Sequence, residues 1–434
     1  MKTKERLIIK NFGPIVKAEI DIKPFMVFIG ESGSGKSVIL KLLSLFRWIY
    51  KQQQLYYSLE ILTKGRVDFE AHINQRLELE LHNSSLIDYF QKGSFANYEI
   101  DDIIFTIQAD TDTKFTISNK RDTKKVSLEK ISFITDERVI IPTLLNNTTR
   151  NARFPYHLTS TYEDFRFAFN ELKKVNNEQV AIKTMGVSLN SQKSSYDEQF
   201  FISHNNQTYQ VRFHDSSSGI KSASIVEIMS HYYPFNFNKQ DIFINFYGKV
   251  APNFIKLLGK NFENVQNTTP EEMMMRNVMQ NIVLSFEEIS NTDARISIFI
   301  EEPELNLFPN AQKNLVEHLV YSCFEPPKKD KNKTIHIAFS THSPYILSSL
   351  NCLLLAYEVA NKNPNLKEKV ETIIPNKFWL DINKFNAFKV ENGEVFSIIE
   401  KETNLILAES IDEVSEEIGI LFDSLLDLEN VNET

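Results

Sequence analysis

Apolar residues along the chain fall into short runs whose spacing alternates between that of strands and that of helices. Near the N-terminus, Leu7–Phe12 and Val16–Ile22 alternate apolar and polar residues, as half-buried strands do, and Phe25–Ile29 is apolar throughout. Later in the chain, the apolar runs Ile296–Ile300 and Thr334–Ser340 each end in polar residues. Strand-like runs separated by helix-like stretches predict an α/β sheet with parallel strands.

The middle of the chain has weaker patterns. Ile103–Ile107 and Ile131–Thr135 are strand-like, residues 160–185 are helix-like, residues 186–213 alternate like a hairpin, and residues 222–290 are mostly helix-like. We therefore expect an antiparallel β layer near the N-terminus together with helical insertions. Sustained heptads are missing, which argues against a long coiled coil.

Composition places the chain among soluble globular proteins. Of its 434 residues, 42% are hydrophobic and 24% are charged. No run reaches the roughly 18 apolar residues of a membrane helix, and no signal-peptide-like segment precedes Leu7. Cys323 and Cys352 fit neither a zinc nor a disulfide pattern. We expect a cytoplasmic protein without a membrane partner.

The negative charge is concentrated in the C-terminal tail. The net charge is −9, and nine acidic residues with no Lys or Arg lie between Glu409 and Glu433, so the remainder is neutral. A neutral body does not indicate nucleic-acid binding, although a local basic stripe would still permit it. In the tail, Ile411, Val414 and Ile418 recur at helical spacing. A helix packed on its own domain is the simpler interpretation, and a docking surface for a basic partner is the alternative.

The strongest chemical signal is a P-loop of the form G-x-x-x-x-G-K-S between an apolar strand and the helix-like Val38–Tyr50. Its glycines allow backbone N–H groups and the helix N-terminus to face phosphate oxygens. Lys36 is expected to reach the β- and γ-phosphates, and the Ser37 hydroxyl to bind Mg²⁺. The predicted nucleotide-binding residues are Gly30, Glu31, Ser32, Gly33, Ser34, Gly35, Lys36 and Ser37.

Two later strands end in residues that suit the same chemistry. Ile296–Ile300 runs into Glu301 and Glu302, an arrangement in which the first acid orients Mg²⁺ and the second activates water. Thr334–Ser340 is followed by His342, which is placed to donate to a γ-phosphate. Taken alone, an acidic loop after an edge strand and a structural histidine are ordinary explanations. The P-loop earlier in the chain favours the active-site interpretation.

A serine-rich turn precedes the helix-like Ala223–Ser230. Ser217, Ser218 and Gly219 at a helix start form an anion-friendly N-terminus. An ordinary helix cap is the simpler explanation of this segment by itself.

Together these segments resemble ABC-type ATPase heads and, more narrowly, the branch that contains SMC, RecF and OLD-family proteins. Within that branch the chain resembles stand-alone OLD-like ATPases of bacterial anti-phage operons, including those of PARIS, Septu and retron-linked systems. The segments that carry the resemblance are Gly30–Ser37, Ser217–Gly219, Glu301–Pro309 and Ser340–Pro344, with Leu7–Ile15 and Ile411–Val414 near the two ends.

The resemblance implies a role for each matching residue. Lys36 and the P-loop amides hold the phosphates of ATP, and Ser37 with Glu301 positions Mg²⁺. Glu302 is the catalytic base and His342 the switch histidine. The usual aspartate at the Mg²⁺ position is here Glu301, whose side chain is longer.

The resemblance also implies that two subunits sandwich ATP head-to-tail. Ser217, Ser218 and Gly219 are then the signature that meets the γ-phosphate of a second subunit, and Asn306 lies in a loop crossing the dimer interface. Arg138, after a strand, is a weaker candidate. The signature lacks the full Leu-Ser-Gly-Gly form, and its long separation from Glu301 argues against a transporter subunit.

The implied function is that of a regulatory ATPase. OLD nucleases carry a Toprim domain after the ATPase, but no Glu with an Asp-x-Asp cluster follows His342. We therefore expect no nuclease in this chain and a separate effector, either a Toprim-type nuclease or another toxin, controlled by the ATPase oligomer. The alternative is a RecF- or SMC-like ATPase that binds DNA in DNA repair or metabolism.

The expected organisation has four parts: an N-terminal ATPase lobe with the P-loop (1–54), a variable middle region (55–215), a lobe with the signature, a helical insertion, the acidic pair and the switch histidine (216–380), and a tail with an acidic helix (381–434).

Overall fold

The computed structural model describes most of the chain. The described residues are 5–63, 68–109, 113–118, 127–145, 154–176, 178–193, 198–204, 209–239, 241, 293–326 and 332–407. Their strands form one sheet of eleven strands and one of four. Among the helices in these ranges, none combines the length and the hydrophobicity needed to cross a bilayer.

The larger sheet has a parallel half and an antiparallel half. Its strand order is β6-β5-β4-β1-β2-β15-β14-β3-β13-β12-β7, and the last five strands run parallel to one another. These five are β14 (Phe385–Glu391), β3 (Phe25–Ile29), β13 (Lys333–Thr341), β12 (Asp293–Glu301) and β7 (Ser127–Ile134). Because they are parallel, the segments that follow β3, β7, β12 and β13 meet at one edge of the sheet.

The antiparallel half confirms the β layer expected near the N-terminus. Its strands are β1 (Arg6–Phe12), β2 (Ile15–Asp21), β4 (Phe95–Ile100), β5 (Ile103–Ala109), β6 (Thr113–Ser118) and β15 (Glu394–Ser397). β1 pairs with both β2 and β4 in antiparallel register, whereas β15 meets β2 in parallel. The alternation of apolar and polar residues in these strands places one face against the core.

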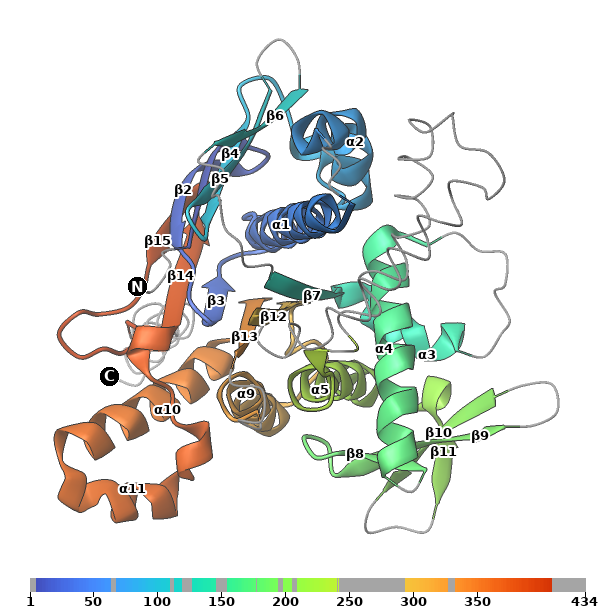
Figure 1. Cartoon of the computed structure of the whole chain (residues 1–434). Coiled ribbons are helices and arrows are strands. Elements are labelled where there is room, and N and C mark those ends of the chain that lie inside the picture. The colour runs from blue at the N-terminus through green and yellow to red at the C-terminus, as the bar shows by residue number, and fades with distance from the viewer. Residues whose placement is uncertain are drawn as a thin grey trace, which may run out of the picture.

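The helix α1 (Lys36–Thr63) lies between the two halves of the curved sheet (Figure 1). Its Phe46 stacks on Tyr98 of β4 with ring centroids 5.3 Å apart, while the helix also contacts β7, β12 and β13. The domain boundary expected at residue 54 falls within this helix. The opposite face of the parallel strands is covered by α5 (Ser218–Phe235), α9 (Pro309–Phe324) and α10 (Pro344–Lys362).

The middle region differs from its sequence pattern in one place. The helix expected over 160–185 is α4 (Tyr156–Val175), and it is followed by a strand, β8 (Gln179–Ile182). That strand buries every second residue against a helix–sheet core, so tertiary packing overrides the helix-like composition. The smaller sheet is completed by β9 (Val187–Lys193), β10 (Glu198–His204) and β11 (Gln210–Arg212).

The remaining helices are α2 (Phe69–Asn83), α3 (Ile141–Leu144) and α11 (Lys367–Ile373). Most of the helix-like stretch 222–290 and the acidic tail from Glu409 onward lie outside the described residues.

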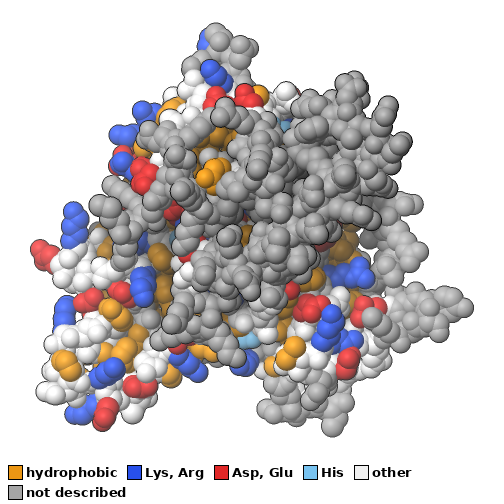
Figure 2. Space-filling view, viewed as in Figure 1, with side chains coloured by type: hydrophobic (Ala, Val, Ile, Leu, Met, Phe, Trp, Pro, Cys, Tyr) orange, Lys and Arg blue, Asp and Glu red, His pale blue; other side chains and the backbone are white. Residues whose placement is uncertain are grey.

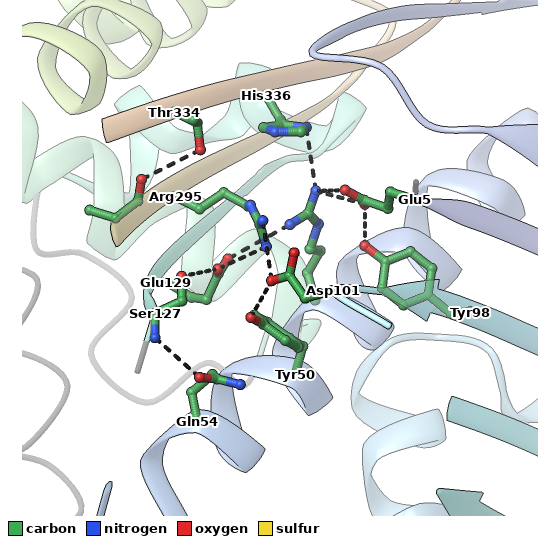
Figure 3. A network of polar contacts seen from close by, with 12 residues as sticks. Glu5, Tyr50, Gln54, Tyr98, Asp101, Ser127, Glu129, Arg295, Thr334 and His336 are labelled. Carbon is green, nitrogen blue, oxygen red and sulfur yellow. Dashed lines mark hydrogen bonds and ion pairs between the residues drawn. The ribbon is translucent and has the colours of Figure 1, made fainter. Parts of the chain in front are cut away.

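A buried network of charges joins the two halves at the amino ends of the parallel strands (Figure 3). Arg47 of α1 donates to Glu5 over 2.8 Å and lies 3.9 Å from the carboxylate of Glu129 on β7. Arg295 of β12 lies 3.3 Å from Glu129, and the Tyr98 hydroxyl donates to Glu5. We call these five residues the amino-end network. It ties the P-loop helix to both halves of the sheet.

Candidate active site

The P-loop joins β3 to α1, and its lysine is turned into the loop. Lys36 is only 4% exposed, and its Nζ donates to the carbonyl oxygens of Gly30 and Glu31, each at 2.7 Å. Burial lowers the pKa of Lys36 to about 8, against the opposing influence of Glu302, Glu304 and Glu31. The Lys36 ammonium is thus held inside the P-loop, where the motif predicts that it contacts phosphate.

The loop backbone leaves room for an anion. Gly33 has φ +79°, and a Cβ added there would meet nothing within 4 Å. At Gly30 an added Cβ would lie 2.2 Å from the carbonyl oxygen of Val390, so only glycine fits. The buried Ser34 Oγ has no hydrogen-bond partner among the described residues. An open cradle with an unpaired donor is compatible with a bound phosphate.

Ser37 and Glu301 meet at the start of α1. The Ser37 hydroxyl acts to lower the pKa of the Glu301 carboxylate, which lies 3.8 Å from Lys41 Nζ and 3.5 Å from the backbone nitrogen of Asp136. Glu301 is 3% exposed, and burial raises its pKa.

One carboxylate and one hydroxyl suit Mg²⁺, which keeps several waters and takes further oxygens from substrate phosphates. Within the described ranges, no group of three or more His, Cys, Asp or Glu side chains is arranged to hold a metal by itself. Ser37 and Glu301 therefore fit Mg²⁺ as two ligands of a shell that nucleotide oxygens and water would complete.

The second acid, Glu302, faces His342. His342 Nε2 lies 3.1 Å from Glu302 Oε1, and both side chains remain about one-third exposed. The hydrogen bond from His342 is the main reason that the pKa of Glu302 is lowered, although burial opposes it. Glu302 also has φ +44°, a left-handed conformation that is uncommon for a glutamate. The pair is therefore a carboxylate kept ionised and accessible beside an imidazole.

Glu304 links the acidic loop to the histidine loop, a role that its place in the sequence did not reveal. It accepts hydrogen bonds from Thr341 Oγ1 and from the backbone nitrogen of His342, each at 2.7 Å. Burial raises the pKa of Glu304, and the same two donors oppose that shift. The loop after β12 and the loop after β13 are thereby fixed to each other.

The end of the P-loop, the two acids Glu301 and Glu302, and His342 line one cavity of about 500 Å³ at the carboxyl edge of the sheet. Eight of the eighteen lining residues were predicted as site residues. Those that the motifs did not indicate include Lys41 of α1, Tyr89 before β4, Asp136 in the segment after β7, and His157 of α4. Only Asp136 had a sequence signal, because it follows the strand-like Ile131–Thr135.

The signature residues lie apart from this cavity. Ser217 caps α5, its Oγ accepting from the Ile220 nitrogen at 3.3 Å, and Ser218 is the first helical residue. A Cβ on Gly219 would lie 2.5 Å from the carbonyl oxygen of Asn306, so the signature and the loop after β12 are in close contact. None of these four residues is among the described residues that line the cavity.

Arg138 is also outside the cavity. It is completely buried behind the acidic pair and donates to the carbonyl oxygens of Glu301 and Glu302. It therefore contacts the backbone of the two acids and does not point toward the nucleotide position.

Comparison with known proteins agrees with this geometry. A family model described as AAA ATPase domain matches residues 1–347. A search of curated protein sequences found no significant match. The predicted α/β P-loop ATPase head, with an antiparallel β layer, is confirmed by the family match and by the strand order around the P-loop.

Among solved structures, the chain is similar to an SMC head bound to the C-terminal winged-helix domain of ScpA. That chain is 10% identical, with a TM-score of 0.39, and the match covers 94% of this chain and 98% of the other. An SMC head domain from Thermotoga maritima is 9% identical, with 92% and 98% covered and a TM-score of 0.36. The recombination mediator RecF is 10% identical, with 91% and 98% covered and a TM-score of 0.30.

Proposed function

The chain belongs to the AAA ATPase domain family, and on this premise we propose that it is a Mg²⁺-dependent ATPase that acts as a head-to-tail dimer and controls a separate effector protein. The observation that carries the proposal is the convergence of the P-loop lysine, Ser37, Glu301 and the Glu302–His342 pair on one cavity. These residues come from β3–α1, β12 and β13, which are far apart in sequence.

The side chains divide the work of hydrolysis. Lys36 and the loop amides bind the phosphates, and Ser37 with Glu301 would hold Mg²⁺. When bound, Mg²⁺ neutralises the charge that develops on the phosphate oxygens. Glu302 accepts a proton from water as that water attacks the γ-phosphorus, and the bond to the β–γ bridging oxygen breaks to release ADP. His342 holds the Glu302 carboxylate in place through their 3.1 Å contact.

The position of the signature supports dimerisation. Ser217–Gly219 lies at the N-terminus of α5, a favourable place for a phosphate, yet away from the cavity of its own chain. A second copy bound head-to-tail would bring its signature over the nucleotide. The loop that holds Asn306 also presents Phe308, which is 80% exposed, and a partner subunit would cover this apolar surface.

The regulatory role rests on the resemblance to stand-alone OLD-like ATPases of anti-phage systems. The charge pattern supports it over DNA binding, because the chain outside the acidic tail is neutral. On the face shown in Figure 2, Lys and Arg of the described residues are interspersed with Asp and Glu and do not form one basic stripe. The effector would be a Toprim-type nuclease or another toxin.

The ATPase and the dimer are tested with one variant. Glu302→Gln should bind Mg-ATP normally, lose at least about 100-fold in kcat, and double its mass by light scattering when ATP is added. Lys36→Ala is the matched control, and its mass should not respond to ATP. If Glu302→Gln keeps the monomer mass with saturating ATP while the wild type hydrolyses ATP, the head-to-tail dimer is wrong.

The effector is tested by purifying the tagged chain from its native host. We expect a protein partner in stoichiometric amount whose retention differs between the wild type and Lys36→Ala. An eluate that contains DNA and no such protein would favour a RecF-like function instead.

A further inference from the structure

Arg138 lies at a junction between the signature helix and the acidic pair. It follows β7 in a short 3-10 segment, Asp136–Ile140, and its side chain is completely buried. Its Nε donates to the Ser222 hydroxyl on α5 at 2.9 Å, and one terminal nitrogen donates to the carbonyl oxygen of Glu301 at 2.6 Å. The other terminal nitrogen donates to the carbonyl oxygen of Glu302.

The guanidinium is planar, so these contacts cannot change independently. Its donors form a rigid fork, and leaving one of them buried without a partner is costly. A rotation of α5 that moves Ser222 must therefore turn the fork or leave Nε unpaired. Leaving Nε unpaired is costly, and turning the fork alters the hydrogen bond that holds the Glu302 carbonyl.

Glu302 is sensitive to such a change. Its φ of +44° lies in a region that costs free energy for a residue with a side chain, so its conformation depends on surrounding contacts. Arg138 holds the carbonyl side of this residue, and His342 holds its carboxylate. Losing the first contact frees the backbone to relax and carries the carboxylate away from His342.

A second contact also joins α5 to the loop after β12. Gly219, in the first turn of α5, lies so close to the Asn306 carbonyl that a Cβ would not fit. The first turns of α5 therefore contact the loop after β12 at two places. Gly219 contacts the Asn306 backbone directly, and Ser222 contacts the Glu302 backbone through Arg138.

We propose that Arg138 is a positioning residue that couples α5 to the backbone of Glu302. The proposal rests on the head-to-tail dimer described above. In that dimer the N-terminus of α5 meets the nucleotide bound by the partner, whereas Glu302 serves the nucleotide of its own chain. ATP bound at one of the two sites therefore aligns Glu302 at the other site, so that the rate of hydrolysis depends cooperatively on ATP concentration.

The matched pair for a test lies on α5 itself. Ser222 and Ser224 are both completely buried, but the Ser224 hydroxyl has no hydrogen-bond partner among the described residues. Ser222→Ala removes the Arg138 contact, and Ser224→Ala removes a similar hydroxyl that makes none. Ser222→Cys keeps a weak acceptor at nearly the same volume and should give an intermediate result.

ATP hydrolysis is measured for each variant against ATP concentration, together with mass and thermal unfolding. The wild type should show a Hill coefficient above 1. In Ser222→Ala the coefficient should fall to 1 and kcat about tenfold, with the ATP concentration at half-maximal rate changed less than twofold. Ser224→Ala should match the wild type.

Several results would overturn the coupling. These are a wild-type Hill coefficient of 1, an unchanged coefficient in a folded Ser222→Ala or Ser222→Cys protein, and an equal loss in Ser224→Ala. Wild-type protein that hydrolyses ATP as a monomer would instead contradict the dimer itself. The two failures are therefore distinguishable.

Discussion

The two ends of the parallel strands both carry buried charges, and they use them differently. At the amino ends, the charges of Arg47, Glu5, Glu129 and Arg295 are paired with one another, and the adjoining void is about 10 Å³. At the carboxyl ends, a cavity of about 500 Å³ opens beside Lys36 and the two acids.

The pKa shifts follow the same division. At the amino end, burial raises the pKa of Glu129 and the neighbouring arginines oppose that shift, whereas burial and the same arginines both lower the pKa of His336. At the carboxyl end, Lys36 donates to backbone carbonyls and Glu302 stays partly exposed. Buried charges that pair with one another therefore hold elements together, whereas charges held by the backbone remain available to a ligand.

Of the substitutions that distinguish the two ends of the strands, Arg47→Met should have the largest effect, and the effect should be on stability. Removing one partner of a buried ion cluster leaves Glu5 and Glu129 without their shared cation, which should lower the free energy of unfolding by about 3–5 kcal/mol. The kcat of the folded protein should stay within about twofold, since the cavity is untouched. Urea denaturation and ATPase assays check this, and a large loss of kcat at unchanged stability would contradict the division.

A smaller effect should appear in the pH dependence of ATP binding. The pKa of Lys36 in the free protein is about 8. The phosphates bind the charged ammonium, so above pH 8 each binding event must also take up a proton. The Kd for ATP should then rise by about tenfold per pH unit above 8.

Equilibrium nucleotide binding from pH 7 to pH 9.5 measures this dependence. Lys36→Arg keeps its charge throughout and should show a flat profile over that range. An equally steep rise in Lys36→Arg would assign the titration to another group.

The smallest effect should come from His342→Ala. The hydrogen bond from His342 is the main cause of the lowered pKa of Glu302. Without it the pKa rises, and because a base must be ionised, the acid limb of the kcat/KM profile should move to higher pH. We expect a severalfold loss of kcat at neutral pH. His204→Ala, on the smaller sheet, is the control, and an acid limb that stays in place would show that the histidine does not act through Glu302.

Much of the fold follows from local sequence. The strands near the N-terminus, the P-loop with its helix, and the two apolar strands before Glu301 and His342 were all predicted, because each has a short-range signal. The helix predicted over residues 160–185 was wrong at its C-terminal end, because β8 acquires its strand conformation from pairing with β9. Strand pairing of this kind is a tertiary effect.

For the candidate site the division is similar. The motifs predicted Lys36, Ser37, Glu301, Glu302 and His342, and the structure brings these five to one cavity. Their catalytic roles remain predictions.

Residues that support them have no motif of their own. Glu304 acts through Thr341, and Arg138 acts through carbonyl oxygens about 163 positions away in the chain. Such contacts depend on which strands lie side by side, and no short segment of the sequence indicates that strand order.

The amino acid sequence alone is sufficient for the P-loop, the acidic strand end and the neutral body with its acidic tail, because spacing and composition are local properties of a chain. The tertiary structure decides which charges are paired and which stay accessible. Arg47 and Lys36 lie on one helix, yet the first is enclosed by carboxylates from two halves of a sheet and the second faces a cavity. Burial and partners set the chemistry of each, and both arise only when distant segments pack together.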